Sequence, residues 1–210
     1  MFDIFGFRFF SFLVSALLIS LSAIFFTDVY NEGELIYGED SNSQFKDNST
    51  KWLPYSSAKF SLMYPENWKV EEKISKFHEY DVKLLKSGPF SGLRTFFGII
   101  FESLQGSEKL SNELVLEQTE NFYKNAPISA YSVYEILEKN FTKYKIDGNP
   151  SSSHIIKYTY KENNLGGKLL EIFSIIDKKL FTLTYQSTTQ NFDKELPIIN
   201  RIISSIKILP

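Results

Sequence analysis

A run of 19 residues without a charge, from Phe9 to Thr27, constrains the organisation of this chain more than any other feature. As an α-helix, such a run spans roughly 28 Å, which is about the thickness of the hydrocarbon core of a bilayer. It lacks the polar face that a helix covering a soluble core presents to water. We therefore expect residues 1–27 to form one N-terminal transmembrane helix that contacts the membrane through residues 9–27.

A retained anchor competes with a cleaved signal peptide at this end of the chain. Arg8 is the only basic residue before the run and Asp3 opposes its charge, whereas signal peptides begin with a clearly positive segment. The best cleavage motif, Ser20-Leu21-Ser22, lies inside the apolar run. These features favour the anchor. Arg8 predicts a cytoplasmic N-terminus, so the protein would be single-pass with an extracytoplasmic C-terminal domain.

Residues 28–54 read as a polar tether, because they are rich in Ser, Asn, Asp and Glu and show no sustained hydrophobic period. Asn48-Ser49-Thr50 and Asn140-Phe141-Thr142 are sequons for N-glycosylation. Asn48 and Asn140 are therefore candidate glycosylation sites, which agrees with an external location.

The remaining residues, 55–210, read as one β-rich domain. Phe60, Leu62 and Tyr64 alternate with more polar neighbours, and Pro65 ends this strand. Further strands are expected at 68–72, 82–85, 95–102, 155–160, 169–176 and 180–185. The connections at 163–167 and 177–179 are typical of hairpins and predict antiparallel neighbours.

Two helices are expected beside these strands. Ser111 is a suitable N-cap for a helix over 112–124. Apolar residues recur at three- and four-residue steps from Phe192 to Ile206, which predicts a C-terminal amphipathic helix with Pro197 in its first turn. The fold class is therefore α+β, an antiparallel β-sheet flanked by helices.

Four motifs in order resemble the PsbP-like family. They are the strand and turn Phe60–Trp68, the strand entry Asp147–Pro150, the strand Phe181–Tyr185, and the closing helix and short strand from Leu196 to Ile208. The resemblance implies an α/β/α sandwich and a non-catalytic, extracytoplasmic module. Its best-known branch is an extrinsic subunit of photosystem II that helps retain calcium and chloride. The anchor and the acidic tether depart from that branch, so a non-photosynthetic role is expected.

Composition and motifs exclude several kinds of chemistry. The chain has no cysteine, and 23 basic against 25 acidic residues provide no positive surplus for binding nucleic acid. No nucleophile elbow, zinc-protease, P-loop or dinucleotide motif is present. Ser153 and His154 are adjacent on a predicted strand, so they should point to opposite faces and form no catalytic dyad. The sequence therefore predicts no catalytic residues and no enzyme.

Two groups of side chains are candidate binding sites. Glu79 and Asp81 should share one side of an extended segment, where they could hold calcium weakly, although the pattern favours a solvated loop before a strand. Tyr158, Tyr160 and Tyr185 could line an aromatic groove, or they could pack with their hydroxyls in water. No cofactor is expected other than this weak calcium.

The leading hypothesis is a non-catalytic, membrane-anchored extracytoplasmic module that binds or assembles a membrane-associated protein partner. The alternative is a secreted or periplasmic carrier that holds a small ligand in the aromatic groove.

Overall fold

The computed structural model describes residues 51–72, 80–87, 93, 95–104, 110–125, 131–160 and 164–209. The predicted anchor at 1–27, Asn48, Glu79 and nearly all of the tether lie outside these residues. Among the residues that are described, no helix has the length and apolarity needed to cross a membrane.

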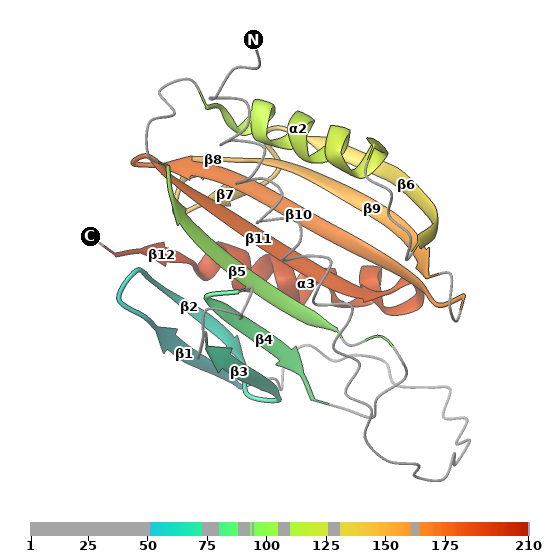
Figure 1. Cartoon of the computed structure of the whole chain (residues 1–210). Helices are drawn as coiled ribbons and strands as arrows, with labels where there is room; N and C mark the ends of the chain where they lie inside the picture. The colour runs from blue at the N-terminus through green and yellow to red at the C-terminus, as the bar shows by residue number, and fades with distance from the viewer. Residues whose placement is uncertain are drawn as a thin grey trace, which may run out of the picture.

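A seven-stranded antiparallel sheet forms the centre of the domain (Figure 1), in the order β3-β4-β5-β11-β10-β9-β6. Its strands are β3 (Trp68–Glu72), β4 (Val82–Lys86), β5 (Phe96–Ser103), β6 (Tyr131–Asn140), β9 (Ser152–Tyr160), β10 (Gly166–Ile176) and β11 (Lys179–Thr188). A second sheet has the order β1-β2-β12, and β7 pairs with β8. These strands are β1 (Trp52–Ser56), β2 (Phe60–Pro65), β7 (Lys145–Ile146), β8 (Asn149–Pro150) and β12 (Lys207–Ile208).

The β10–β11 hairpin organises the centre of the large sheet. Its two turn residues, Asp177 and Lys178, have φ values of 50° and 59°, and the strands pair from Ile176 with Lys179 onward. Two positive φ angles in a two-residue loop define the turn whose twist matches that of the flanking strands. The predicted hairpin at 177–179 is confirmed.

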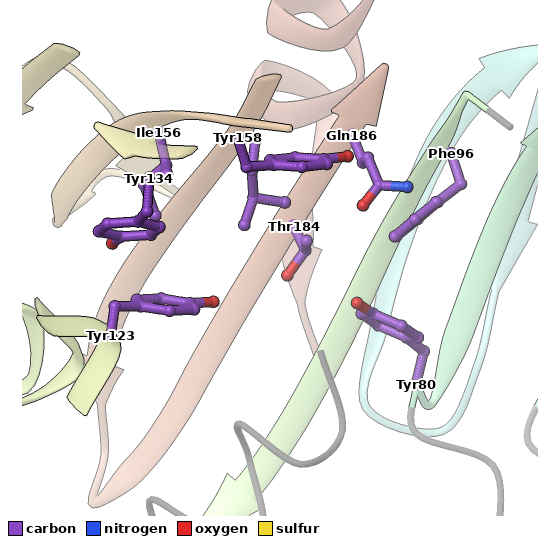
Figure 2. A pocket seen from close by; sticks show the side chains of 9 residues that line it. Tyr80, Phe96, Tyr123, Tyr134, Ile156, Tyr158, Thr184 and Gln186 are labelled. Atoms are coloured by element: carbon purple, nitrogen blue, oxygen red, sulfur yellow. The ribbon is translucent and has the colours of Figure 1, made fainter. Parts of the chain in front are cut away.

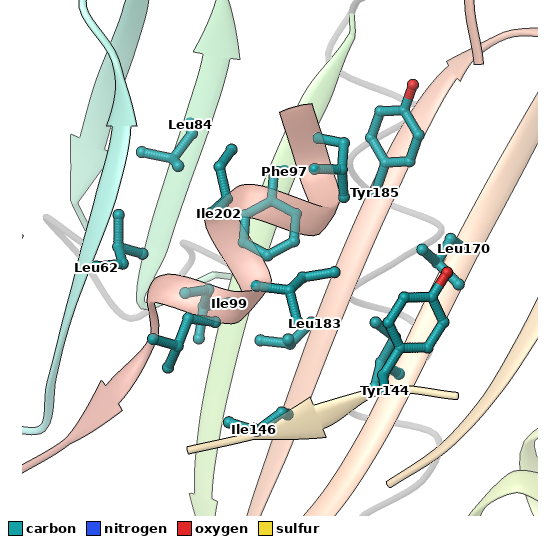
Figure 3. Packing of buried hydrophobic residues seen from close by; sticks show 14 of the residues in the cluster. Leu62, Leu84, Phe97, Ile99, Tyr144, Ile146, Leu170, Leu183, Tyr185 and Ile202 are labelled. Atoms are coloured by element: carbon teal, nitrogen blue, oxygen red, sulfur yellow. The ribbon is translucent and has the colours of Figure 1, made fainter. Parts of the chain in front are cut away.

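Each face of the large sheet is covered by a different helix. Helix α3 (Thr189–Ser205) packs its buried Ile199 and Ile202 into the main core with Phe97 and Leu183 (Figure 3). Helix α2 (Asn112–Asn125) packs on the opposite face through Val115 and Leu116. The antiparallel α+β architecture expected from the sequence is confirmed for the described domain.

The C-terminal helix begins earlier than its apolar stripe indicates. Because α3 starts at Thr189, Pro197 lies in its interior rather than in the first turn, and the sequence prediction is wrong on this point. A proline inside a helix removes one backbone hydrogen bond. The exposed Pro197 is tolerated because the opposite side of α3, which includes Phe192 and Ile203, is buried in the core.

The two longest strands that were missed from the sequence are β6 and β1. β6 is an edge strand whose pairing with β9 is interrupted by two register shifts, so its apolar and polar residues do not alternate cleanly. β1 begins at Trp52, inside the range treated as the tether, and pairs with β2 from Trp52 opposite Pro65. Pro54 and the flanking polar residues conceal this strand.

Candidate functional site

A buried histidine lies between two buried acids on the face of the sheet that α2 covers. His154 of β9 is 1% exposed, and its Nε2 lies 2.7 Å from Oε2 of Glu171 on β10. Its Nδ1 lies 3.7 Å from Oε1 of Glu120 on α2, a distance typical of an ion pair but too long for a hydrogen bond. The imidazole therefore joins the helix to the sheet.

Two more side chains complete this arrangement. Lys139 of β6 forms an ion pair with Glu120. The hydroxyl of Tyr123, also on α2, donates to Oε1 of Glu171 over 3.4 Å. We call Glu120, Lys139, His154 and Glu171 the histidine cluster. It connects α2 with β6, β9 and β10, which are neighbours in the sheet.

The electrostatics of the cluster favour the charged forms of His154 and Glu120. Burial lowers the pKa of His154, but the carboxylates of Glu120 and Glu171 outweigh that effect and hold the pKa above its ordinary value of 6.5. Burial raises the pKa of Glu120, but His154 and Lys139 outweigh it and hold the pKa below 4.5. The cluster therefore favours an imidazolium between two carboxylates.

The geometry of the cluster fits neither a metal site nor a hydrolytic triad. The two carboxylates approach different ring nitrogens of His154, so they do not converge on one point as metal ligands must. Within the described residues, no group of three or more His, Asp or Glu side chains is arranged to hold a metal ion. Ser153 faces the other side of the sheet, opposite Ile172, and donates to Asn140 O. The predicted separation of Ser153 from His154 is confirmed.

An aromatic pocket lies on the same face of the sheet as the cluster, and Figure 2 shows side chains that line it. We define it by its lining residues, which are Tyr80, Phe96, Tyr123, Tyr134, Ile156, Tyr158, Leu169, Thr184 and Gln186. Its cavity is about 10 Å³. A space of this size holds about one water molecule, so a larger ligand would need the rings to move.

Two glycines make room for two of the pocket tyrosines. A Cβ atom at Gly98 would overlap the ring of Tyr80, and one at Gly167 would overlap the phenol of Tyr158. Glycine at these strand positions lets each ring lie flat on the sheet. The backbone beneath the pocket is therefore fitted to its aromatic walls.

Tyr123 belongs to both features. Its ring stacks on Tyr134 with centroids 5.0 Å apart and forms one wall of the pocket, while its hydroxyl reaches Glu171. Ile156 and Leu169 of the pocket lie two residues along their strands from His154 and Glu171. Alternation places each pair on the same face. The histidine cluster and the aromatic pocket therefore form one continuous site.

The predicted groove residues are separated by the fold. Tyr158 does line the pocket. Tyr185 does not, because it is fully buried on the opposite face, where its hydroxyl donates to Phe192 O over 3.0 Å. For Tyr185 the packed alternative holds, because the residue lies in the core under α3, but its hydroxyl is buried rather than in water. Tyr160 falls on β9, and its side chain lies outside the described part of the structure.

Of the candidate calcium and glycosylation residues, Asp81 and Asn140 lie in the described part of the structure and have defined contacts. Oδ2 of Asp81 accepts the Phe101 N–H over 2.7 Å and Oδ1 pairs with Lys59 Nζ over 3.1 Å. Oδ1 of Asn140 accepts the backbone N–H groups of Thr142 and Lys143. Asp81 and Asn140 each organise a local backbone turn or strand edge.

Most residues of this site were not identified from the sequence. Glu171 interrupts an apolar strand, and Glu120 lies near the apolar residues of its helix, so each was a detectable sign of a buried charge. The pairing of Glu120 with His154 depends on segments 34 residues apart, which no local pattern reveals.

Comparisons with solved structures identify the fold. The chain is similar to the solution structure of cyanobacterial PsbP (CyanoP) from Synechocystis sp. PCC 6803, with a TM-score of 0.58 and 13% identity, over 80% of this chain and 98% of that one. It is also similar to LpqN of Mycobacterium tuberculosis, described as involved in cell envelope biogenesis, with a TM-score of 0.52 and 13% identity, over 78% of this chain and 94% of that one. Neither the family models nor the sequences of curated proteins give a match. The domain has a PsbP-like fold, as the sequence resemblance indicated.

Proposed function

We propose that this protein is a non-catalytic, membrane-anchored extracytoplasmic module that binds or assembles a membrane-associated protein partner. The observation that carries the proposal is the PsbP-like fold, shared with CyanoP and with a protein involved in cell envelope biogenesis. Residues 9–27 would supply the anchor and residues 28–54 most of the tether.

The chemistry of the site supports binding rather than catalysis. A general acid or base must reach its substrate within hydrogen-bond distance. The imidazole of His154 is buried at 1% exposure and faces Glu120 and Glu171 on its two sides. The side chain is therefore used to hold the domain together.

Alkaline carbonate extraction tests the anchor. We expect the full-length chain to stay in the membrane pellet, and a variant lacking residues 9–27 to be released. Recovery of the full-length chain in the soluble fraction would contradict the anchor.

Single-cysteine labelling tests the orientation, because the chain has no cysteine of its own. Asn200→Cys lies on an exposed position of α3, and Asp3→Cys precedes the predicted anchor. In intact cells, a membrane-impermeant maleimide should label Asn200→Cys and leave Asp3→Cys unlabelled until the cells are lysed. The reverse pattern would overturn an extracytoplasmic domain.

The proposed partner is tested by cross-linking in the same membranes. Photo-cross-linking groups at exposed positions of the full-length chain should give one discrete adduct with a membrane protein, and excess unlabelled domain should compete for it. Uniform absence of adducts at every position tested would argue against an assembly role.

A small-ligand carrier is the second candidate, and the aromatic pocket favours it. Five of the nine lining residues are aromatic, and Thr184 and Gln186 supply polar groups beside them. This composition is typical of sites for small apolar molecules. N-terminal sequencing of the mature protein separates the candidates, because a soluble carrier requires removal of residues 9–27.

Weak calcium binding through Glu79 and Asp81 is an accessory proposal. The Phe101 N–H fixes one oxygen of Asp81, and calcium would compete with Lys59 for the other. Calorimetry with millimolar calcium should give a binding heat that Asp81→Asn removes. No heat with the unmodified chain would end this proposal.

A further inference from the structure

The histidine cluster is charge-balanced only when His154 carries a proton. Glu120 and Glu171 contribute two negative charges, and Lys139 and protonated His154 contribute two positive ones. A neutral imidazole leaves one excess negative charge where the side chains of His154, Glu120 and Glu171 are each 5% exposed or less. An unbalanced charge in such surroundings is costly.

The contact between the helix and the histidine depends on charge. His154 Nδ1 and Glu120 Oε1 are buried and have no hydrogen-bond partner among the described residues, yet they face each other at 3.7 Å. A neutral imidazole in this position offers Glu120 no opposite charge. The attraction between α2 and β9 at this point is therefore stronger when His154 is protonated and weaker when it is neutral.

The N-terminal end of α2 is held differently. Asn112 Nδ2 donates to Pro150 O over 2.9 Å, and Asn112 Oδ1 accepts the Ile175 N–H over 2.8 Å. The Ser152 hydroxyl donates to Asn112 O over 2.5 Å. None of these groups titrates in the physiological range. Among the described residues, the ionisable contacts of α2 lie in its C-terminal half, at Glu120 and Tyr123.

We propose that His154 is a proton-controlled latch: its imidazolium holds the C-terminal half of α2 against the sheet, and loss of its proton releases that half. The latch is a property of the folded domain and does not depend on the membrane-anchored role. Its charged and titratable neighbours are Glu120 and Tyr123 on α2, Glu171 on β10 and Lys139 on β6.

Release of the helix would open the aromatic pocket. Tyr123 forms one wall of the pocket and stacks on Tyr134 of β6. When the C-terminal half of α2 moves away, this wall moves with it, while Tyr158 and Leu169 remain on the sheet. The pocket, which holds about one water in the latched form, then becomes accessible to a small apolar molecule.

The first test measures the protonation of the histidine directly. The chain has two histidines, so His78→Gln leaves His154 as the sole imidazole in the full-length protein. NMR of labelled histidine should give one titration with a pKa above 6.5, consistent with its two acidic neighbours. A pKa at or below 6.5 would overturn the latch.

The second test follows the helix itself. Hydrogen exchange is measured on the full-length His78→Gln protein two pH units below and above the pKa of His154, with correction for the intrinsic exchange rate. Residues 118–125 should lose at least tenfold in protection at the higher pH, whereas α3 should change less than twofold. Equal loss in both helices, or no loss in either, contradicts the proposal.

Paired variants separate the charge from the shape of the side chain. His154→Gln in the His78→Gln background should leave residues 118–125 weakly protected at both pH values. Adding Glu171→Gln rebalances the charge, because Glu120 and Lys139 then cancel, and should restore protection that no longer varies with pH. If His154→Gln in this background does not fold, the hydrogen-exchange comparison of the His78→Gln protein at the two pH values still tests the latch. A double variant that folds but gains no protection would count against the latch.

An apolar fluorescent dye tests the opening of the pocket. Dye binding by the His78→Gln protein should rise in the same pH interval in which residues 118–125 lose protection. Loss of protection with unchanged dye binding would overturn the link between the latch and the pocket.

Discussion

Lys86 Nζ lies 2.5 Å from Glu195 Oε1, and this ion pair ties β4 to the buried side of α3. The side chain of Glu195 is 4% exposed, whereas that of Lys86 is 30% exposed. The hydroxyls of Tyr185 and Ser187 each lie 3.3 Å from the other oxygen of Glu195. The core under α3 therefore contains a carboxylate with partners for both of its oxygens.

Breaking this pair should destabilise the domain. Lys86→Met leaves the buried Glu195 without a cation, and the free energy of unfolding should fall by about 2–4 kcal/mol. Urea denaturation measures the change. Lys69→Met is the matched control, because its ion pair with Glu71 is exposed, and it should change stability by less than about 0.5 kcal/mol. Equal effects of the two variants would show that Glu195 does not need its partner.

The histidine cluster predicts a stability optimum in mildly acidic solution. The pKa of His154 is raised on folding, so its contribution is complete below 6.5 and is lost as pH rises through the folded value. The pKa of Glu120 is lowered, so its contribution is complete above 4.5 and is lost as pH falls through the folded value. Urea midpoints should therefore be highest between about pH 4.5 and 6.5. Replacement of His154 by Gln should reduce the loss of stability above pH 6.5. A variant that loses stability as steeply as the unmodified protein over this range would exclude His154 as the cause.

The fit between Gly98 and Tyr80 predicts a substitution that the sequence would not suggest. Gly98→Ala places a methyl group into the Tyr80 ring and should cost about 1–3 kcal/mol, because the ring must move. Combined with Tyr80→Ala, the same change should cost much less than the sum of the two single changes. Thermal unfolding of the four proteins measures the coupling, and simple additivity would contradict the predicted overlap.

The side chain of Asn112 fixes the start of α2. Asn112→Ala should cost about 1–3 kcal/mol, because Pro150 O and the Ile175 N–H each lose a partner. Ser111 caps the same helix through the Leu114 N–H, and Ser111→Ala should cost about 1 kcal/mol. Chemical denaturation with Asn112→Asp as the control tests the assignment, since this change keeps an acceptor for the Ile175 N–H, removes the donor to Pro150 O and adds a negative charge. An Asn112→Ala variant as stable as the unmodified protein would refute it.

Much of the secondary structure follows from local patterns. The strand Phe60–Pro65 shows the two-residue alternation of a sheet covered on one face, and the proline ends it because proline has no N–H to donate. Gly148 has a φ of 82°, a backbone angle that glycine adopts readily at a turn. The order of these signals was sufficient to indicate the PsbP-like fold. By contrast, β6 is an edge strand with two register shifts, and these shifts break the alternation that would have revealed it.

The sequence by itself therefore determined where the chain is apolar, where it turns and which motifs follow one another, because these depend on neighbouring residues. The site depended on tertiary structure. Tyr158 and Tyr185 look alike in sequence, but the register of β9 and β11 places one in the pocket and the other under α3. His154 acquires its two carboxylates from segments 34 residues before it and 17 residues after it. Strand pairing and helix packing bring these groups together away from water. Their charges interact more strongly there than they would in solvent.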